Sequence, residues 1–245
     1  MDKNRDAIFI PGDYQQAAAT QGPAVQRFWH YSKRMIIDRC LPPAMDDIVL
    51  DAGCGSGVIA AYLSEKSRRV VGLDANADAI AFASRRFARA NLSFIQALID
   101  QPPAENISAD KIYCLEVIEH IYPEQARRML ALWHTMLRPN GRILLTTPNS
   151  RSVWPLIEWF MDRLRLAPPM AADQHVTRYC PRTLAAFCEE AGFSIVQMTS
   201  VCHIAPWLAW INWQLAERVC RRELNRPGLW GPILVAVLEK KGDHK

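Results

Sequence analysis

A glycine-rich turn behind a short apolar strand is the feature that most constrains this sequence. Residues 49–57, Val-Leu-Asp-Ala-Gly-Cys-Gly-Ser-Gly, run from apolar side chains into an acid and then into three closely spaced glycines. Glycines at this spacing let a ligand approach the main chain more closely than side chains would allow. The segment therefore predicts a strand, a ligand-binding turn and the start of a helix.

The rest of the chain repeats this alternation of strand and helix. Short apolar runs predict buried strands, and the longer segments between them predict helices. The expected strands are residues 48–51, 69–74, 92–96, 111–115, 142–147, 192–201 and 233–239. The expected helices are 57–66, 76–90 and 123–136, the last stopped by the Arg-Pro-Asn-Gly of residues 138–141. The pattern is that of an α/β fold with a seven-stranded sheet.

Composition excludes several classes of protein. The 245 residues are 50% hydrophobic, which is enough for a large core, and 29 basic against 25 acidic side chains give a net charge of only +4. This excludes a disordered chain and a polycationic nucleic-acid coat. The 7 cysteines form no Cys-x-x-Cys pair, and the N-terminus does not resemble a secretory signal. We therefore expect a cytoplasmic protein.

The ligand of the turn follows from the residues around the glycines. Val58 stands where a dinucleotide fingerprint needs its third glycine, and Asp51 would place a carboxylate against a pyrophosphate. An acid there suits a ligand with a cationic amino-acid end, and S-adenosylmethionine carries an ammonium and a sulfonium. Asp74 ends the next predicted strand, where a carboxylate can accept hydrogen bonds from both ribose hydroxyls. S-adenosylmethionine is therefore the expected cofactor.

Taken together, residues 49–57, Asp74, 110–121 and 137–149 resemble the successive motifs of class I S-adenosylmethionine-dependent methyltransferases. The resemblance implies a Rossmann-like sheet in the order 3-2-1-4-5-7-6, with strand 7 antiparallel and helices on both faces. It also implies an N-terminal helical cover over residues 1–45. The methyltransferase domain would then span residues 46–245, with insertions at about 151–178 and 203–230.

The resemblance also implies a set of cofactor contacts. Leu98 stands where the family usually has an acid that binds the adenine amino group, and Asp100 is nearby but out of step. This departure concerns only the adenine contact. The implied cofactor-binding residues are Asp51, Gly53, Cys54, Gly55, Gly57, Asp74, Ala75, Leu98, Leu115 and Glu116.

A Glu-x-x-Glu-His motif follows the fourth predicted strand. If Glu116 begins a helical turn, Glu116, Glu119 and His120 share one face and can hold Mg²⁺ or Mn²⁺, which would activate a substrate hydroxyl. The motif is similar to that of ubiquinone-pathway O-methyltransferases and of small-RNA 3′-terminal 2′-O-methyltransferases. In the latter a further histidine completes the metal site, and His175 matches it. The alternative is a site without metal, in which His120, beside Glu119, is the catalytic base.

Two apolar segments bear on the methyl acceptor. Residues 154–170 are rich in aromatic side chains, which predicts a hydrophobic acceptor such as an isoprenoid, a lipid or an aromatic ring, unless they pack onto their own domain. Residues 207–222 combine tryptophans with arginines, as in helices that lie on membranes, although a buried helix explains the pattern about as well. We therefore predict a small apolar acceptor and a peripheral membrane contact.

The sequence thus predicts an S-adenosylmethionine-dependent methyltransferase that methylates a hydroxyl of a small apolar, aromatic or lipid-like molecule. Three alternatives stay open. RNA 2′-O-methylation is disfavoured by the charge of +4 and the scattered arginines, and we expect no DNA partner. N-methylation of a small amine would need no metal. A non-catalytic binding module is disfavoured because Asp51, Asp74, Glu116 and His120 are all present.

Overall fold

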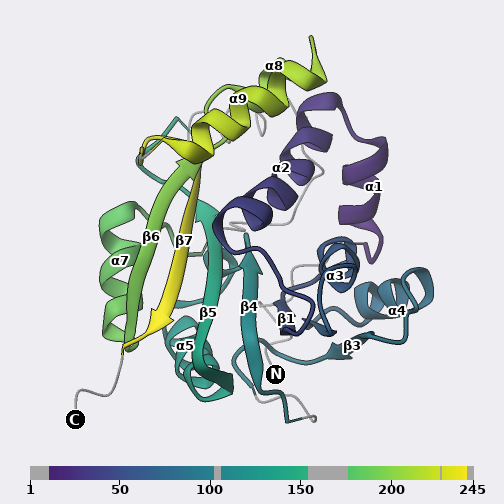
Figure 1. The fold of residues 1–245 in the computed structure, drawn as a ribbon, viewed down its shortest axis with the longest axis vertical. Coiled ribbons are helices and arrows are strands. Elements are labelled where there is room, and N and C mark those ends of the chain that lie inside the picture. The colour runs from purple at the N-terminus through teal and green to yellow at the C-terminus, as the bar shows by residue number, and fades with distance from the viewer. Residues whose placement is uncertain (1–10, 102–105, 154–175, 227, 242–245) are drawn as a thin grey trace, which may run out of the picture.

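A mixed sheet in the order β3-β2-β1-β4-β5-β7-β6 organises the chain (Figure 1). The computed structural model describes residues 11–101, 106–153, 176–226 and 228–241. Strands β1 to β5 run parallel, whereas β7 is antiparallel to both β5 and β6. The predicted topology is confirmed. The strands are β1 Ile48–Ala52, β2 Arg69–Asp74, β3 Leu92–Gln96, β4 Ala109–Leu115, β5 Leu137–Pro148, β6 Phe193–Val201 and β7 Ile233–Lys240.

Helices cover both faces of this sheet because the strands bury side chains on both sides. Along β1, Val49 belongs to one apolar core and Leu50 to the other, as the two-residue period of a strand requires. Phe28 of α2 contributes to the first core, and Trp133 of α5 contributes to the second. The described helices are α1 Tyr14–Gln21, α2 Ala24–Cys40, α3 Val58–Ser64, α4 Ala77–Arg86, the 3₁₀ turn η1 Ile118–His120, α5 Pro123–Met136, α7 Pro181–Glu190, α8 Ala205–Leu208 and α9 Trp213–Asn225.

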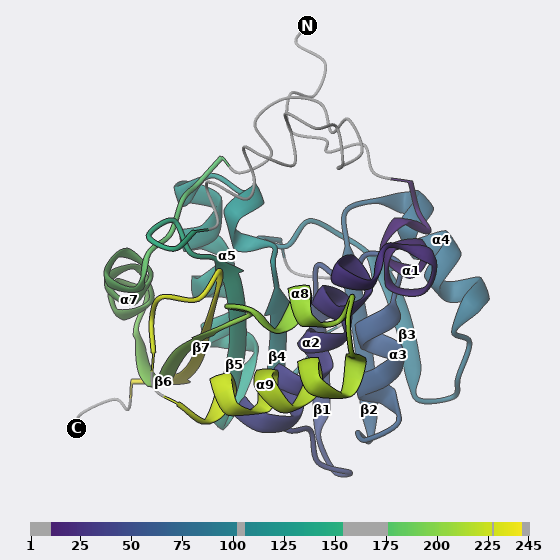
Figure 2. The ribbon, with the colours of Figure 1, turned by 90° about the horizontal axis from the view of Figure 1, so that it is seen from above.

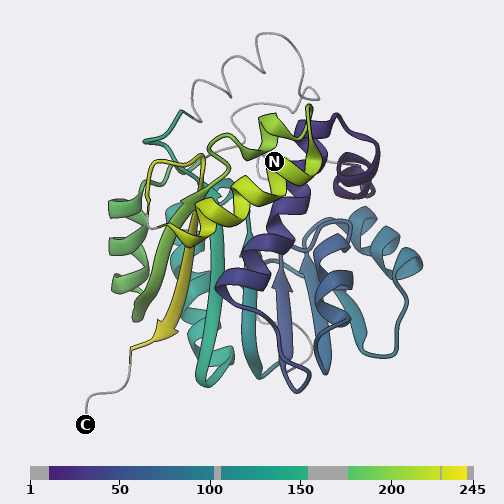
Figure 3. The same ribbon diagram turned by 45° about the horizontal axis from the view of Figure 1, so that its top comes forward.

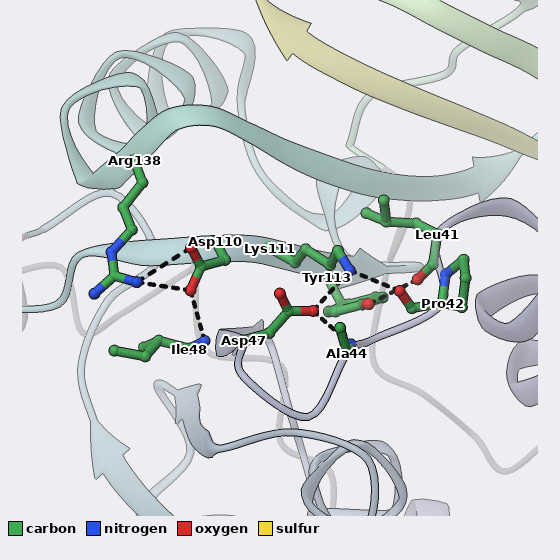
Figure 4. Close-up of polar contacts among 9 residues, drawn as sticks. All are labelled: Leu41, Pro42, Ala44, Asp47, Ile48, Asp110, Lys111, Tyr113 and Arg138. Atoms are coloured by element: carbon green, nitrogen blue, oxygen red, sulfur yellow. Dashed lines mark hydrogen bonds and ion pairs between the residues drawn. The ribbon is translucent and has the colours of Figure 1, made fainter.

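The link from α2 to β1 is tied to the start of β4 (Figure 4). Lys111 donates hydrogen bonds to the carbonyl of Pro42 at 2.7 Å and to the carboxylate of Asp47 at 2.6 Å. The Tyr113 hydroxyl donates to the carbonyl of Leu41 at 2.7 Å. Because these bonds join residues far apart in sequence, they fix the C-terminal end of α2 against the amino edge of the sheet. The N-terminal half of α2 then reaches the opposite, carboxyl edge.

Two predicted boundaries differ from the structure by four residues or more. Helix α4 ends at Arg86 and not at residue 90, because the chain turns back and Arg89 donates to the Ser64 hydroxyl on α3 at 3.0 Å. Helix α5 ends at Met136 as predicted, but strand β5 begins at Leu137 and not at residue 142, so residues 138–141 lie inside the strand. The register shift between Ala109 and Lys111 on β4 accommodates these extra residues as a bulge.

The two predicted insertions are described to different extents. Residues 154–170, the aromatic segment, lie outside the described residues. The segment 203–230 contains α8 and α9, which lie against α2 at the carboxyl end of the sheet (Figures 2 and 3). In the parts of the chain that the structure describes, no helix has the length and apolar character needed to cross a bilayer.

Gly57 offers a test of how the fold depends on the glycine-rich turn. It has φ of +80°, and a β-carbon there would lie 2.8 Å from that of Ala83 and 2.9 Å from the ring of Phe94. We expect Gly57→Ala to lower the free energy of unfolding by about 2 kcal/mol, through backbone strain and overlap. Urea denaturation measures this change.

Gly228→Ala is the matched control, because no heavy atom lies within 4 Å of a β-carbon built there. Its free energy of unfolding should stay within about 0.5 kcal/mol of wild type. Equal losses in the two variants would show that the turn has no special steric demand.

Candidate functional site

The glycine-rich turn lies at the carboxyl end of β1, as predicted. Gly53, Gly55 and Gly57 all have positive φ, at +79°, +49° and +80°. The amides of Gly53 and Cys54 donate to the carbonyl of Leu73, which ties the turn to the end of β2. A β-carbon at Gly53 would lie 2.4 Å from Val117. The main chain of the turn is therefore held close to the ends of both neighbouring strands.

Asp51 is a buried acid with one unpaired carboxylate oxygen. Its side chain is 3% exposed, and its Oδ2 atom has no hydrogen bond within the described structure. Burial and, to a smaller extent, the nearby charge of Asp74 raise the pKa of Asp51 to about 7. A carboxylate in this state is stabilised by an incoming cation. The site therefore fits the ammonium and sulfonium groups of S-adenosylmethionine.

Asp74 is held by the main chain at the end of β2. Its Oδ2 accepts a hydrogen bond from the amide of Gly55 at 2.8 Å, and its Oδ1 accepts one from the amide of Asn76 at 2.8 Å. These bonds fix the carboxylate, and each oxygen keeps a lone pair with which to accept a ribose hydroxyl. The geometry fits the adenosyl end of the expected cofactor.

Helix α1 lies directly over the glycine-rich turn. The Gln15 Oε1 accepts a hydrogen bond from the amide of Ser56 at 2.9 Å, and the amide of Gln16 donates to the Ser56 hydroxyl at 2.9 Å. Gln15 also fills the space in which a side chain at Gly55 would have to lie. The N-terminal helices therefore cover the turn, and Gln15 satisfies an amide that the turn leaves open.

Glu116 does not begin a helical turn, contrary to the expectation from its motif. It has φ of +59°, and η1 starts only at Ile118. Its carboxylate turns toward α2, where it forms an ion pair with Lys33 and accepts a hydrogen bond from the Trp29 indole at 2.8 Å. Burial would raise the pKa of Glu116, but the charge and hydrogen bond of Lys33 outweigh burial and lower it. Glu116 is therefore a charged anchor for α2.

Glu119 and His120 lie on η1 and face different surroundings from Glu116. Glu119 is buried and accepts a hydrogen bond from the Thr147 hydroxyl at 3.0 Å. Burial, with a smaller contribution from Glu116, raises the pKa of Glu119 to about 8. The His120 Nε2 lies 4.0 Å from a carboxylate oxygen of Glu119, and the imidazole is partly exposed. The motif thus presents an imidazole at the carboxyl end of β4, with a buried carboxyl behind it.

The predicted metal site can be tested only in part. His175 lies outside the described residues, and the described ones contain no group of three histidine, cysteine or acidic side chains placed to hold a metal ion. Glu116 is moreover occupied by Lys33. With its carboxylate on Lys33, Glu116 as placed does not face a cation, and the metal site of Glu116, Glu119, His120 and His175 stays a prediction.

The other predicted cofactor contacts lie around the same edge. Ala75 follows Asp74 and is exposed, Leu115 is buried at the end of β4, and Cys54 is buried within the turn. Leu98 is 44% exposed just beyond β3. Asp100 pairs with Arg128 at 2.7 Å, while its other oxygen is buried without a hydrogen bond. The roles of these residues toward the cofactor stay predictions.

Comparison with known proteins identifies the family. A family model described as a methyltransferase domain matches residues 25–198. This chain is a class I S-adenosylmethionine-dependent methyltransferase. A probable S-adenosylmethionine-dependent methyltransferase of Mycolicibacterium smegmatis is 26% identical over 74% of this chain and 65% of its own length. A ubiquinone biosynthesis O-methyltransferase of Aeromonas salmonicida is 25% identical over 64% of this chain and 67% of its own length.

Solved structures share the fold at lower identity. A chain from the complex between the Haloferax volcanii Trm112 methyltransferase activator and a putative methyltransferase has a TM-score of 0.66 at 18% identity, with 96% of each chain covered. The N-methyltransferase NodS of Bradyrhizobium japonicum, solved with S-adenosylhomocysteine, has a TM-score of 0.59 at 15% identity, covering 93% of this chain and 97% of its own. The methyltransferase spans 65% and 54% of the lengths of the first curated mycobacterial relatives it matches.

Sequence reasoning missed the part of the site that α2 supplies. Lys33 and Trp29 hold Glu116, and His30 lies close enough to both charges for them to affect its titration. Burial, together with the charge of Lys33, lowers the pKa of His30 to about 4. A signal was present, because Trp29 and Lys33 are four residues apart and share a face of an amphipathic helix. A lysine on that face needs an acidic partner.

We expect cofactor binding to be linked to the protonation of Asp51. Because its pKa is about 7 and the charges facing it are Asp74 and Lys33, a ligand ammonium will favour the carboxylate. The affinity for S-adenosylhomocysteine should rise from about pH 6 to about pH 7.5 and then level off, with proton release at the lower pH. Calorimetry in two buffers of different ionisation enthalpy measures both; a flat affinity over this range would contradict the raised pKa.

We also expect Glu116 to depend on Lys33. Lys33→Met should lower the free energy of unfolding by about 3 kcal/mol, because it leaves a largely buried carboxylate without its cation. Adding Glu116→Gln to this variant should recover part of the loss. Urea denaturation of the two single variants and the double variant measures the coupling; strictly additive changes would show that the ion pair contributes nothing.

Proposed function

We propose that this methyltransferase transfers a methyl group to a hydroxyl of a small apolar, aromatic or lipid-like acceptor. The observation that carries the proposal is the part-exposed imidazole of His120 at the carboxyl end of β4, 4.0 Å from the buried carboxyl of Glu119. An imidazole can remove a hydroxyl proton near neutral pH. The ubiquinone biosynthesis O-methyltransferases among the relatives add support for an apolar, hydroxylated acceptor.

The residues of the site have distinct roles in this proposal. When bound, S-adenosylmethionine would supply an electrophilic methyl group: the acceptor oxygen would attack the methyl carbon in line with its bond to sulfur, and S-adenosylhomocysteine would leave as that bond breaks. Asp51 binds the cationic amino-acid end, and Asp74 binds the ribose hydroxyls. His120 takes the proton that the acceptor oxygen loses, and Glu119, 4.0 Å away, stabilises the charged imidazole once its own carboxyl is ionised. Because the reacting groups are held in one geometry, alignment supplies much of the acceleration.

Of the predicted N-terminal cover, residues 1–45, the helices α1 and α2 act as a cover in this proposal. Helix α1 lies on the glycine-rich turn through Gln15, and α2 reaches Glu116 through Lys33. These contacts would exclude water from the methyl transfer. The acceptor would then have to enter between the cover and the strand ends, so the cover helps to select its size and polarity.

The test of this function is transfer of labelled methyl from S-adenosylmethionine to a matched panel. The panel contains an alkylated phenol or catechol, the corresponding amine and a short RNA, each with EDTA or with added Mg²⁺ or Mn²⁺. We expect transfer to the phenolic hydroxyl and no loss in EDTA, because Lys33 already neutralises Glu116. Loss of activity in EDTA with recovery by Mg²⁺ or Mn²⁺ would support the metal site of Glu116, Glu119, His120 and His175 instead.

In the same assay, His120→Ala should lower kcat by about a hundredfold while binding S-adenosylhomocysteine as wild type does. His134→Gln is the control, because His134 lies in the last turn of α5 and packs against Phe193. Equal rates for His120→Ala and wild type would remove the catalytic role. Transfer to the amine alone would replace O-methylation by N-methylation, and cofactor binding without any transfer would favour a binding module.

A further inference from the structure

Helices α8 and α9 carry a cluster of exposed apolar side chains at the carboxyl end of the sheet. Trp210 and Ile211 are each 82% exposed, and Trp207 is 49% exposed. Side chains of this size are normally buried, and their grouping within a few residues marks an interaction site. We define the α8–α9 surface as Ile204, Trp207, Trp210, Ile211, Leu215, Arg218 and Arg222, all of which are exposed.

The arginines of this surface point away from the protein. Helix α9 buries Ala216, Cys220 and Leu224, which are spaced four residues apart and form one stripe. Helical geometry places Arg218 and Arg222 on the opposite face. Neither arginine has a hydrogen bond or an ion pair with any residue that the structure describes. Two cationic groups are therefore available to a partner beside the exposed tryptophans.

The acids of the same segment form hydrogen bonds or ion pairs within the protein. Between residues 203 and 226 the acids are Glu217 and Glu223. Glu217 accepts a hydrogen bond from the Trp213 indole at 3.0 Å and pairs with Arg221 at 3.6 Å. Glu223 accepts from the amides of Cys202 at 2.9 Å and Ile204 at 3.2 Å. The outward charge of the α8–α9 surface is consequently positive.

We propose that the α8–α9 surface docks on a lipid bilayer with anionic headgroups. Tryptophan and isoleucine side chains enter the boundary between headgroups and acyl chains, and arginine side chains pair with lipid phosphates above them. A second copy of the chain fits less well, because a twofold contact through this surface would bring Arg218 and Arg222 toward the same arginines of the partner. An anionic, apolar partner satisfies both parts of the surface.

The surface is one helix away from the methyl-transfer site. The Trp213 ring packs against Phe28 of α2 with 5.1 Å between ring centroids, and against Tyr31 with 5.5 Å. Figures 2 and 3 show α8 and α9 lying along α2, the helix that holds Glu116 through Lys33. Docking would place the covered end of the sheet beside the bilayer. Binding to vesicles is measured without any methyl acceptor, so its result does not depend on the proposed reaction.

The experiment is flotation of the full chain with phosphatidylcholine vesicles and with vesicles that also contain phosphatidylglycerol. We expect binding to the anionic vesicles only, weakened by salt. Arg218→Gln with Arg222→Gln should reduce the partition coefficient by about thirtyfold. Trp210→Ser with Ile211→Ser should abolish binding, because the apolar insertion is lost. Each variant is checked for wild-type thermal unfolding and S-adenosylhomocysteine binding, so that misfolding is recognised.

Two control variants remove charged or apolar side chains from other exposed positions. Arg85→Gln with Arg86→Gln removes two positive charges from the exposed end of α4, and Met45→Ser removes an exposed apolar side chain before β1. Both should bind vesicles as wild type does. Failure of the wild type to float with either vesicle would overturn the proposal. So would a stable dimer in sedimentation that Trp210→Ser with Ile211→Ser dissociates, because the surface would then belong to a second copy.

Discussion

Balancing the negative charge at the carboxyl ends of β1, β2 and β4 is the constraint on which the rest of the site depends. The nearby charge of Asp74 raises the pKa of Asp51, and the charge of Glu116 raises the pKa of Glu119. Lys33 lowers the pKa values of Asp51, Glu116 and Glu119, so its ammonium acts on the whole group. Lys33 alone cannot balance four carboxylates, and this leaves Asp51 and Glu119 inclined to keep a proton. A cationic cofactor completes the balance.

This charge balance explains why the N-terminal helices belong to the site. A sheet with the order of these strands opens a crevice between β1 and β4, where neighbouring connections leave in opposite directions. The acids lie at or just after the carboxyl ends of β1, β2 and β4, and α2 brings Lys33 to them from outside the sheet. The network of Asp47, Lys111 and Tyr113 at the amino edge fixes the other end of α2. The lysine therefore arrives in a defined position.

The sheet could be predicted from the sequence because each of its strands is a short buried run followed by a recognisable turn. The periodicity placed β2 and β3 at their observed bounds, and the glycines of residues 53–57 located the ligand-binding turn. The conformation of Glu116 could not be predicted in this way. A positive φ is uncommon for a residue with a side chain, and here Lys33 and Trp29, which lie more than eighty residues earlier, hold it. The sequence around Glu116 itself carries no signal for such a distant partner.

The same helix gives the methyltransferase a physical route from its surface to its chemistry. Trp213 packs on Phe28, which precedes Trp29 on α2, and Lys33 lies about one turn farther along the same helix. A partner bound to α8 and α9 would therefore contact elements that pack on α2, the helix whose Lys33 neutralises Glu116. Any shift of α2 would change the charge balance around Asp51, and with it the affinity for a cationic ligand. The cover is thus the element through which surface contact and cofactor capture can be coupled.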